Sequence, residues 1–289
     1  MQTVISVIIA CCNGEKTIAQ QLEALLAQES TRKWETVFSD NRSTDASADI
    51  VRAYQQKMPD LHLVEAFERQ GKSHALNKAV SVSRGEYLLF CDADDVVAPG
   101  YIQAMGDALD RHGFVAAGFD FEKLNSPHVA ASRKNCQKTA LQKYGHPPFL
   151  VHAGGGSLGV RKTIFDSIGG FSNDYRVLED TDFCFRAQLA GHALHFVAQA
   201  TVHVRLRESI KNIYKQQRDY GEFNVKLYKD YRKLGMPSLP WSAGLKGWIR
   251  LLLNTPRLRH RHLRLRYLRN WSWKIGRVKG CIKYRIWAL

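Results

Sequence analysis

Three carboxylates follow an apolar run in the first third of the chain. The run Tyr87–Cys91 has the composition of a strand buried in a parallel sheet, and Asp92, Asp94 and Asp95 follow it directly. In open α/β sheets, ligands bind beyond the carboxyl ends of the strands. Clustered carboxylates repel one another unless a cation is bound, and Mg²⁺ or Mn²⁺ carrying substrate phosphates would supply that charge. The spacing predicts either a divalent-metal site or an acidic turn opening the next helix at Asp95 or Pro99.

Strand and helix patterns alternate up to this cluster. The predicted strands are Val4–Ala10, Glu35–Ser39, Leu61–Ala66 and Tyr87–Cys91, and the predicted helices between them are Glu15–Ala27, Asp45–Lys57 and Gly71–Ser83. Strands separated by helices of this length favour right-handed βαβ units. We therefore expect an α/β fold with a mostly parallel central sheet.

The second half of the chain has a looser pattern. We expect strands at Val115–Phe121, Ala193–Val197 and Ala200–Val204, a loop over 122–150, and helices over Glu179–Leu189 and Glu208–Lys233. Pro237, Pro240, Asn254 and Pro256 predict breaks over 236–256. Apolar residues spaced by three or four between Leu265 and Ile286 predict a final basic helix.

The charge excess of the chain lies entirely in its C-terminal part. The net charge is +15, no Asp or Glu follows Asp230, and residues 231–289 carry 15 of the 42 Lys and Arg. Five of the six tryptophans also lie there, at Trp241, Trp248, Trp271, Trp273 and Trp287. This mixture suits an interfacial helix on anionic lipid; nucleic-acid binding and a solvated or oligomer-forming face are the alternatives.

Other sequence features narrow the class of protein. The six cysteines have neither metal-ligand spacing nor the density of a disulfide scaffold, which is typical of reduced thiols in a cytosolic protein. The apolar start Val4–Cys12 lacks a basic leader and reads as a first strand. No stretch approaches ~18 uncharged apolar residues, so we expect no membrane-spanning segment.

Six short motifs occur in a characteristic order. They are Asn13-Gly14-Glu15-Lys16, Asp40 to Asp45, Gly71 to Asn77, Asp92-Ala93-Asp94, Gly169-Gly170-Phe171, and Glu179-Asp180-Thr181-Asp182 with Arg186. In this order they resemble the family 2 glycosyltransferases, nucleotide-sugar enzymes with a single GT-A-type, Rossmann-like α/β domain, over about residues 3–235. The resemblance implies a catalytic domain over 1–235, divided into a nucleotide-sugar-binding half (1–120), an acceptor half (121–205) and an amphipathic helix (206–235). Residues 236–289 would then be a basic helical C-terminal extension.

The resemblance assigns the donor-side residues. Asp40 matches the aspartate that contacts the nucleobase, most often uracil, and a carboxylate can accept a base N–H. Lys72 lies beside the nucleotide at a helix N-terminus, which favours anions. Asp92 and Asp94 match the DxD motif, in which Asp94 binds the metal bridging the diphosphate and Asp92 contacts the ribose or the metal shell. From the residues alone, Asp40 could be a plain turn aspartate and Lys72 a solvated lysine.

The acceptor-side residues follow from the same resemblance. Asp180 is the expected general base for the acceptor hydroxyl, with Glu179 beside it; the alternative is that both decorate a helix N-terminus. One base opposite a departing diphosphate implies in-line displacement and inversion at the anomeric carbon. Gly155 could let the backbone pass close to a sugar, or lie in a loop without function. His203 occupies a place where some members supply a further metal ligand, although a lone strand histidine is often structural.

The sequence therefore predicts an inverting, metal-dependent glycosyltransferase of the hexosyl type, using Mn²⁺ or Mg²⁺ and a nucleotide-sugar, in the first instance a UDP-sugar. Its acceptor would be a glycan or a lipid-linked glycan in cell-envelope or exopolysaccharide synthesis. We expect it in the cytoplasm, peripheral on the inner membrane face through the C-terminal basic helix. The alternative is a nucleotide- or nucleic-acid-binding protein that uses the basic tail, and we favour it less because Asp180 would then have no task.

Overall fold

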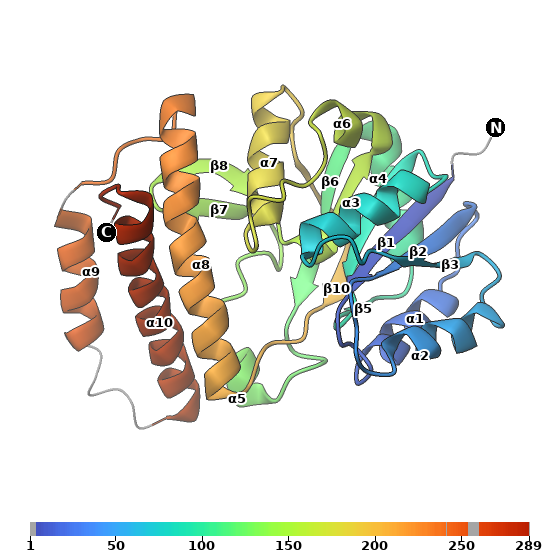
Figure 1. The fold of residues 1–289 in the computed structure, drawn as a ribbon, viewed down its shortest axis with the longest axis horizontal. Helices are drawn as coiled ribbons and strands as arrows, with labels where there is room; N and C mark the ends of the chain where they lie inside the picture. The colour runs from blue at the N-terminus through green and yellow to red at the C-terminus, as the bar shows by residue number, and fades with distance from the viewer. Residues whose placement is uncertain (1–3, 241, 254–259, 289) are drawn as a thin grey trace. The chain divides into compact units, whose positions relative to one another are not determined.

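The structure is a computed structural model that describes residues 4–240, 242–253 and 260–288. The chain divides into two compact units (Figure 1). Unit 1 consists of Met1–Asp120, Cys136–Gln142 and Val151–Arg205, and unit 2 of Phe121–Asn135, Lys143–Leu150 and Leu206–Leu289. The predicted functional division at residue 235 remains a prediction.

Unit 1 is built on an eight-stranded sheet with the order β3-β2-β1-β4-β9-β6-β10-β5. Its strands are β1 (Ile5–Cys11), β2 (Trp34–Asp40), β3 (Leu61–Glu65), β4 (Tyr87–Asp92), β5 (Val96–Val97), β6 (Phe114–Asp120), β9 (Leu158–Arg161) and β10 (His195–His203). The pairs β3-β2, β2-β1, β1-β4 and β6-β10 are parallel, whereas β9 and β5 run antiparallel to their neighbours. The predicted α/β fold with a mostly parallel sheet is confirmed.

Helices cover both faces of this sheet (Figure 1). They are α1 (Ile18–Leu26), α2 (Ser47–Gln55), α3 (Lys72–Val82), α4 (Tyr101–Arg111), α6 (Lys162–Ser167) and α7 (Glu179–Leu189). Because strand side chains alternate, Ile5 and Ile9 pack in the core under α1, α2 and α4, whereas Ile8 packs in the core under α3, α6 and α7. Burial on both faces explains why the strands read as continuous apolar runs.

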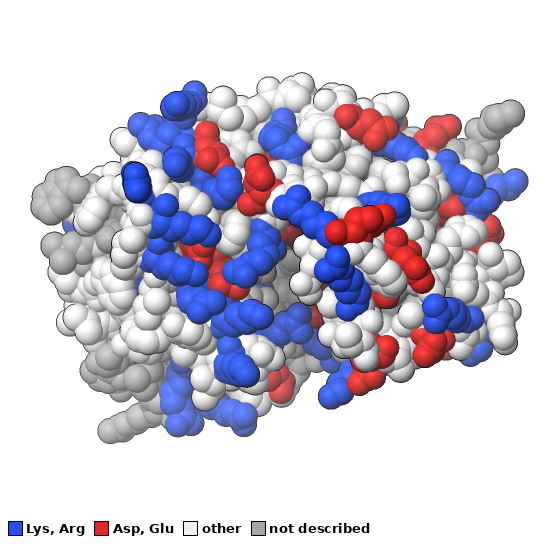
Figure 2. Space-filling model, in the orientation of Figure 1, with Lys and Arg blue, Asp and Glu red and all other residues white. Residues whose placement is uncertain are grey.

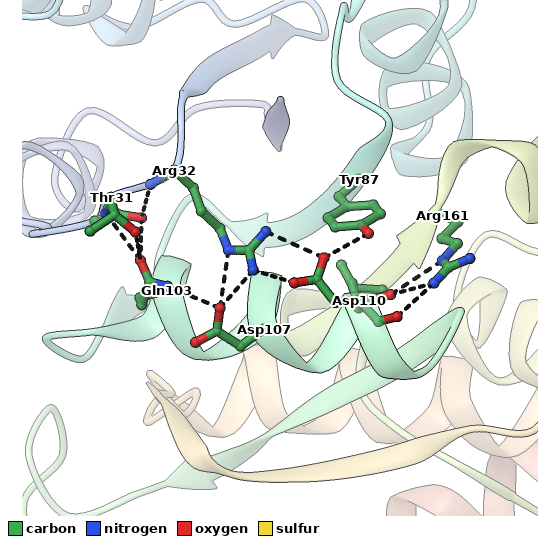
Figure 3. A network of polar contacts seen from close by, with 9 residues as sticks. Thr31, Arg32, Tyr87, Gln103, Asp107, Asp110 and Arg161 are labelled. Carbon is green, nitrogen blue, oxygen red and sulfur yellow. Dashed lines mark hydrogen bonds and ion pairs between the residues drawn. The ribbon is translucent and has the colours of Figure 1, made fainter. Parts of the chain in front are cut away.

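A polar network holds α4 at the amino end of β4 (Figure 3). The Arg32 guanidinium donates to Asp107 at 2.7 Å and also contacts Asp110, while the Tyr87 hydroxyl donates to Asp110 at 2.9 Å. Arg161 donates to the carbonyl groups of Leu109 and Asp110 in the last turn of α4. Tyr87 and Asp92 are the first and last residues of β4, so this network lies about 16 Å from the carboxyl end of the strand and is structural.

Unit 2 is largely helical. It contains α5 (Pro127–Ala130), α8 (Ile210–Tyr231), the 3-10 turn Arg232–Leu234, α9 (Ser242–Leu253) and α10 (Arg261–Tyr284). The backbones of α8 and α10 come very close, because a Cβ at Gly276 would lie 2.0 Å from the carbonyl oxygen of Arg218. The buried Glu222 of α8 pairs with Lys279 and Lys283 of α10, each at 2.7 Å. No helix in the described ranges combines the length and apolar composition needed to cross a membrane.

Several sequence expectations need correction. The two strands expected over 193–204 are the single strand β10, with a register shift between Val197 and Thr201. The expected loop 122–150 contains α5, β7 (Gln142–Gly145) and part of β8 (Pro148–His152); β7 and β8 form a two-stranded sheet. The breaks expected over 236–256 are interrupted by α9, which begins two residues after Pro240, because proline disfavours a helix interior rather than the chain before a helix. The expected stops at Asn254 and Pro256 lie outside the described residues.

Candidate functional site

The register of the parallel strands brings two predicted donor residues to one edge of the sheet. Asp40 ends β2 and is paired with Cys11 of β1, and Asp92 ends β4 and is paired with Ala10 of β1. The two aspartates are therefore two strand positions apart, about 10 Å at the usual strand spacing. This edge is the carboxyl end of β1, β2 and β4, where the sequence predicts ligand binding.

Three carboxylates converge beyond β4. Asp92, Asp94 and Asp95 each offer one oxygen, and these oxygens lie within 4.8 Å of one another. Asp95 is buried and accepts the backbone N–H of Arg205 at 2.8 Å. Burial raises the pKa of Asp95 well above its usual value, and the charges of Asp92 and Asp94 add to the effect. Asp95 therefore has a mainly structural role, whereas Asp92 and Asp94 are half-buried and more accessible to a ligand.

Lys72 lies in the first turn of α3 and contacts two of the predicted site carboxylates. Its Nζ is 2.5 Å from Oδ1 of Asp92 and 3.6 Å from Oε1 of Glu179. Burial disfavours the charge of Lys72, but the nearby Asp92 and Glu179 outweigh burial and hold its pKa well above its usual value. Lys72 is therefore a permanent positive charge between the DxD motif and the start of α7.

At the start of α7, backbone N–H groups hold the Asp180 carboxylate in one orientation. Oδ2 of Asp180 accepts the N–H of Gly155 at 2.8 Å, and Oδ1 accepts the N–H of Thr181 at 2.6 Å. A Cβ built on Gly155 would lie 3.4 Å from the Cβ of Asp180 and 3.6 Å from the Nζ of Lys72, so the three residues share one small region. Glu179 is buried, and burial raises its pKa to about 7, with Lys72 opposing the shift and Asp180 adding to it.

The glycine run before β9 passes directly over the DxD motif. A Cβ at Gly156 would lie 2.9 Å from Oδ2 and 3.2 Å from the backbone nitrogen of Asp92, which is closer than real Cβ contacts. Any side chain at this position would displace Asp92. The glycine backbone thus approaches Asp92 and Asp180, whereas its predicted approach to a sugar stays a prediction.

Asn41 joins the loops that carry Asp40 and Lys72. Its Nδ2 donates to the carbonyl groups of Ala66 and Arg69, and its Oδ1 accepts the N–H of Gly71 at 2.7 Å. Asp40 itself is buried and accepts the N–H of Ser43 at 3.1 Å. From the sequence we assigned no role to Asn41. Its position directly after the motif aspartate is the one signal that could have indicated a role.

Two histidines lie near the site in different ways. His203 is not in the carboxylate group; its Nδ1 is 2.7 Å from Oδ2 of Asp120, and its role as a metal ligand remains a prediction. His152, at the end of β8, was not predicted. Its Nδ1 lies 3.5 Å from Oγ1 of Thr181, and burial lowers its pKa while the charge of Asp180 opposes that shift. His152 stands alone in a segment without a motif, so the sequence carried no signal for it.

The remaining residues of the last motif have a structural task. Asp182 accepts from Nε of Arg186 at 2.8 Å, and the same guanidinium donates to the carbonyl groups of Ile168 and Gly170. This fixes the turn that follows α6 and leaves Glu179 and Asp180 as the acceptor-side carboxylates. A cavity of about 630 Å³ lies elsewhere in unit 1, lined by α4, the segment before it, the loop after α1 and Gln199 of β10, and none of the predicted site residues lines it.

The chain is similar to proteins of bacterial polysaccharide assembly. Over 95 residues, 32% of this chain, it is 34% identical to the poly(ribitol-phosphate) beta-glucosyltransferase of Bacillus spizizenii. Over 149 residues, 52% of this chain, it is 28% identical to the succinoglycan biosynthesis protein ExoU of Rhizobium meliloti. The matched regions span only 15% and 41% of the length of these relatives.

Solved structures share the fold at low sequence identity. The mannosyltransferase PcManGT of Pyrobaculum calidifontis, in complex with GDP-Man and Mn²⁺, aligns with a TM-score of 0.63 at 20% identity, covering 100% of this chain and 77% of that one. TarS 1–349 of S. aureus, in complex with UDP-GlcNAc, aligns with a TM-score of 0.58 at 17% identity, covering 96% and 92%.

The sequence profile described as glycosyl transferase family 2 matches residues 6–169, which include Asp40, Lys72, Asp92, Asp94 and Gly155. The matched region is more than half of the chain, and the chain therefore belongs to glycosyltransferase family 2.

Proposed function

We propose that this protein is an inverting glycosyltransferase that moves a hexose from a nucleotide-sugar to an acceptor hydroxyl. The observation that carries the proposal is the position of Lys72, whose ammonium lies between Asp92 and Glu179 and beside Asp180. Donor-side and acceptor-side groups from separate elements of unit 1 thus meet at one point. A UDP-sugar is the first donor to test, although the two structural neighbours named above carry different nucleotides.

The carboxylate group fits a divalent cation. Asp92 and Asp94 offer hard oxygen ligands, which Mg²⁺ and Mn²⁺ prefer, and the complex of PcManGT with GDP-Man contains Mn²⁺. Asp95 is engaged by Arg205, so Asp92 and Asp94 would hold the ion, with His203 as a further candidate. When bound, such an ion would neutralise charge that develops on the leaving diphosphate. Lys72 adds a fixed positive charge at the same place, and Asp40 would accept a donor group of the nucleobase.

Asp180 is the proposed general base. Two backbone N–H groups fix its orientation, and the Thr181 hydroxyl also donates to Oδ1 at 3.2 Å, so the further lone pair lies on Oδ2. The acceptor hydroxyl would transfer its proton to Asp180 as its oxygen forms the new bond to the anomeric carbon and the bond to the diphosphate breaks. Attack from the side opposite the leaving group inverts the anomeric configuration. Glu179 and His152 would shape the acceptor side around this carboxylate.

Calorimetric titration of the full chain with UDP, GDP and dTDP, with and without Mn²⁺ or Mg²⁺, tests the donor half of the proposal. We expect one nucleotide to bind with metal dependence, D94N to lose that binding by at least about tenfold, and D180N to retain it. Asp49→Asn in α2 is the matched control, because this aspartate is exposed and pairs with Arg52 on the same helix. Equal binding by D94N and the wild type would contradict the assigned metal site.

We further propose that the acceptor is a glycan or lipid-linked glycan of the cell envelope and that the protein works in the cytoplasm on the inner membrane face. The relatives named for poly(ribitol-phosphate) and succinoglycan support this acceptor class. Unit 2 supports the location: α10 exposes Trp271 and Ile282, Trp287 follows it, and exposed Leu252 and Leu253 end α9.

Basic side chains accompany these apolar ones. Lys and Arg gather on the face of unit 2 over α8 in Figure 2. Lys211 and Lys215 of α8 are exposed. Exposed aromatic and aliphatic groups among Lys and Arg suit the surface of an anionic bilayer. Trp273 is half-buried and its ring faces the Arg277 guanidinium, so it is less available, and Trp241 lies outside the described residues.

Co-sedimentation with phosphatidylglycerol vesicles tests the location. We expect the double variant I282S/W287S to lose at least about tenfold in vesicle affinity, because both side chains are more than half exposed and would enter the interface. Leu189→Ser, an exposed leucine of unit 1, is the control. Unchanged binding in the double variant would remove these residues from the proposed membrane contact.

A further inference from the structure

One buried arginine of unit 2 has no counter-charge. Arg269 of α10 is 6% exposed, and its Nη2 donates to the carbonyl oxygen of Arg207 at 3.2 Å. Its Nε and Nη1 have no hydrogen-bond partner among the described residues. These two nitrogens carry three of the five N–H donors of the guanidinium. Most of the hydrogen-bonding capacity of Arg269 is therefore unused in the interior.

The electrostatic surroundings of Arg269 make its position more unusual. Burial lowers the pKa of Arg269 to about 10, the positive charge of Arg133 lowers it further, and Tyr220 opposes the shift. In the described part of the chain, no carboxylate pairs with Arg269. A buried cation with a second cation nearby and no anion is strongly unfavourable unless something else compensates it.

Other buried or interfacial charges of the same helix are compensated. Arg277 of α10 is equally buried, yet its guanidinium donates to Oδ1 of Asn224 and to the carbonyl oxygen of Ala288. Lys279 and Lys283 share the carboxylate of Glu222. Arg269 thus differs from these neighbours in having two nitrogens, Nε and Nη1, without an acceptor among the described residues, which points to an acceptor that is not part of the chain.

We propose that Arg269 and Arg133 form the centre of an anion site in unit 2 that takes a phosphate group. A phosphate has acceptor oxygens in several directions and two negative charges, so it can satisfy unused guanidinium donors and offset two cations at once. Arg133 is half-buried, with its guanidinium 5.5 Å from the centre of the Phe121 ring. Since Nε and Nη1 of Arg269 are enclosed, a phosphate reaches them only when neighbouring side chains of unit 2 move aside.

This site is separate from the residues of the proposed transfer reaction and does not rest on that function. The phosphate could belong to a soluble ion or to the headgroup of a lipid. Both sources offer the same chemistry to the guanidinium groups, and the experiment below separates them.

Thermal unfolding of the full chain in a phosphate titration at constant ionic strength tests the proposal. We expect saturating phosphate to raise the unfolding temperature of the wild type by about 5 °C. Arg269→Met should abolish this rise and, without phosphate, unfold at or above the wild-type temperature, because it removes an uncompensated buried cation. Arg266→Met, at an exposed arginine on the same helix, should keep the response to phosphate.

Vesicles of phosphatidylglycerol and of phosphatidylcholine form the second arm. A loss of binding to phosphatidylglycerol in R269M but not in R266M identifies a lipid phosphate, and a response to inorganic phosphate with unchanged vesicle binding identifies a soluble one. Arg133→Met should weaken the same response if R269M does not fold. Absence of any phosphate effect on the wild type at constant ionic strength, or an equal effect on R269M, overturns the proposal.

Discussion

Replacing Glu179 by Gln should stabilise the protein, and increasingly so as the pH rises. Burial raises the pKa of this carboxyl group from 4.5 to about 7, even with the Lys72 ammonium 3.6 Å away. A raised carboxyl pKa means that the folded state holds its proton longer than the unfolded state does. The contribution of Glu179 to the free energy of unfolding is therefore most favourable below pH 4.5 and is lost as the pH rises through 7.

The size of this stabilisation follows from the difference between the usual pKa of 4.5 and the raised pKa of about 7. Ionising Glu179 costs the folded state roughly 1 kcal/mol at pH 5 and about 3 kcal/mol at pH 8. Because Gln cannot ionise, E179Q should gain about 2 kcal/mol relative to the wild type between these two pH values. For a chain of this size that gain corresponds to about 5 °C in unfolding temperature.

Denaturant unfolding at pH 5 and pH 8, in buffer with a chelator that removes divalent cations, measures this gain. Glu86→Gln, at an exposed glutamate, should show no comparable dependence on pH. If the ion pair with Lys72 dominated, E179Q would instead be less stable than the wild type at pH 8, with a deficit that grows with pH. That result would contradict the claim that burial makes the ionised form of Glu179 unfavourable in the folded state.

Three further substitutions have clear expected outcomes. Gly156→Ala should weaken metal-dependent nucleotide binding at least about tenfold in calorimetry while the fold is kept, because the new Cβ lies 2.9 Å from an oxygen of Asp92; unchanged binding would contradict this contact. Gly276→Ala should lower the free energy of unfolding by about 2 kcal/mol or more in denaturant titration, because its Cβ would meet the carbonyl oxygen of Arg218 at 2.0 Å; a neutral change would mean that α8 and α10 are less closely packed. Asn41→Ala should lower the free energy of unfolding by about 1–3 kcal/mol in the same assay and also weaken nucleotide binding, because it removes hydrogen bonds to the loop before α3. If stability and nucleotide binding were both unchanged, Asn41 would not be the link between the loops.

Much of unit 1 could be predicted because local pattern and topology agree there. The apolar runs that become β1, β2 and β4 are buried on both faces, and the helices between them force parallel pairing. Parallel pairing alone places Asp40 and Asp92 at the same edge. The sequence could therefore predict that these two aspartates share one sheet edge, whereas their roles stay predictions.

The parts that escaped prediction depend on contacts distant in sequence. Strand β9 has four residues and is held between β4 and β6 by antiparallel pairing, which no local periodicity shows. Strand β10 pairs with β6 with a register shift between Val197 and Thr201, which the local sequence pattern does not show. The contact of Lys72 with Asp92 joins the start of α3 to the end of β4, and only the packed fold brings these two groups together.

We propose that Asp94 and Asp180 have different roles at one site, and a turnover assay separates these roles. Purified wild type, D94N, D180N and the control D49N would be incubated with the nucleotide-sugar selected by binding, and release of nucleoside diphosphate would be followed. We expect release by the wild type and D49N, a loss of at least about 100-fold in D180N with donor binding intact, and loss of both release and donor binding in D94N. Wild-type turnover that persists in D180N would contradict the assignment of Asp180 as the base.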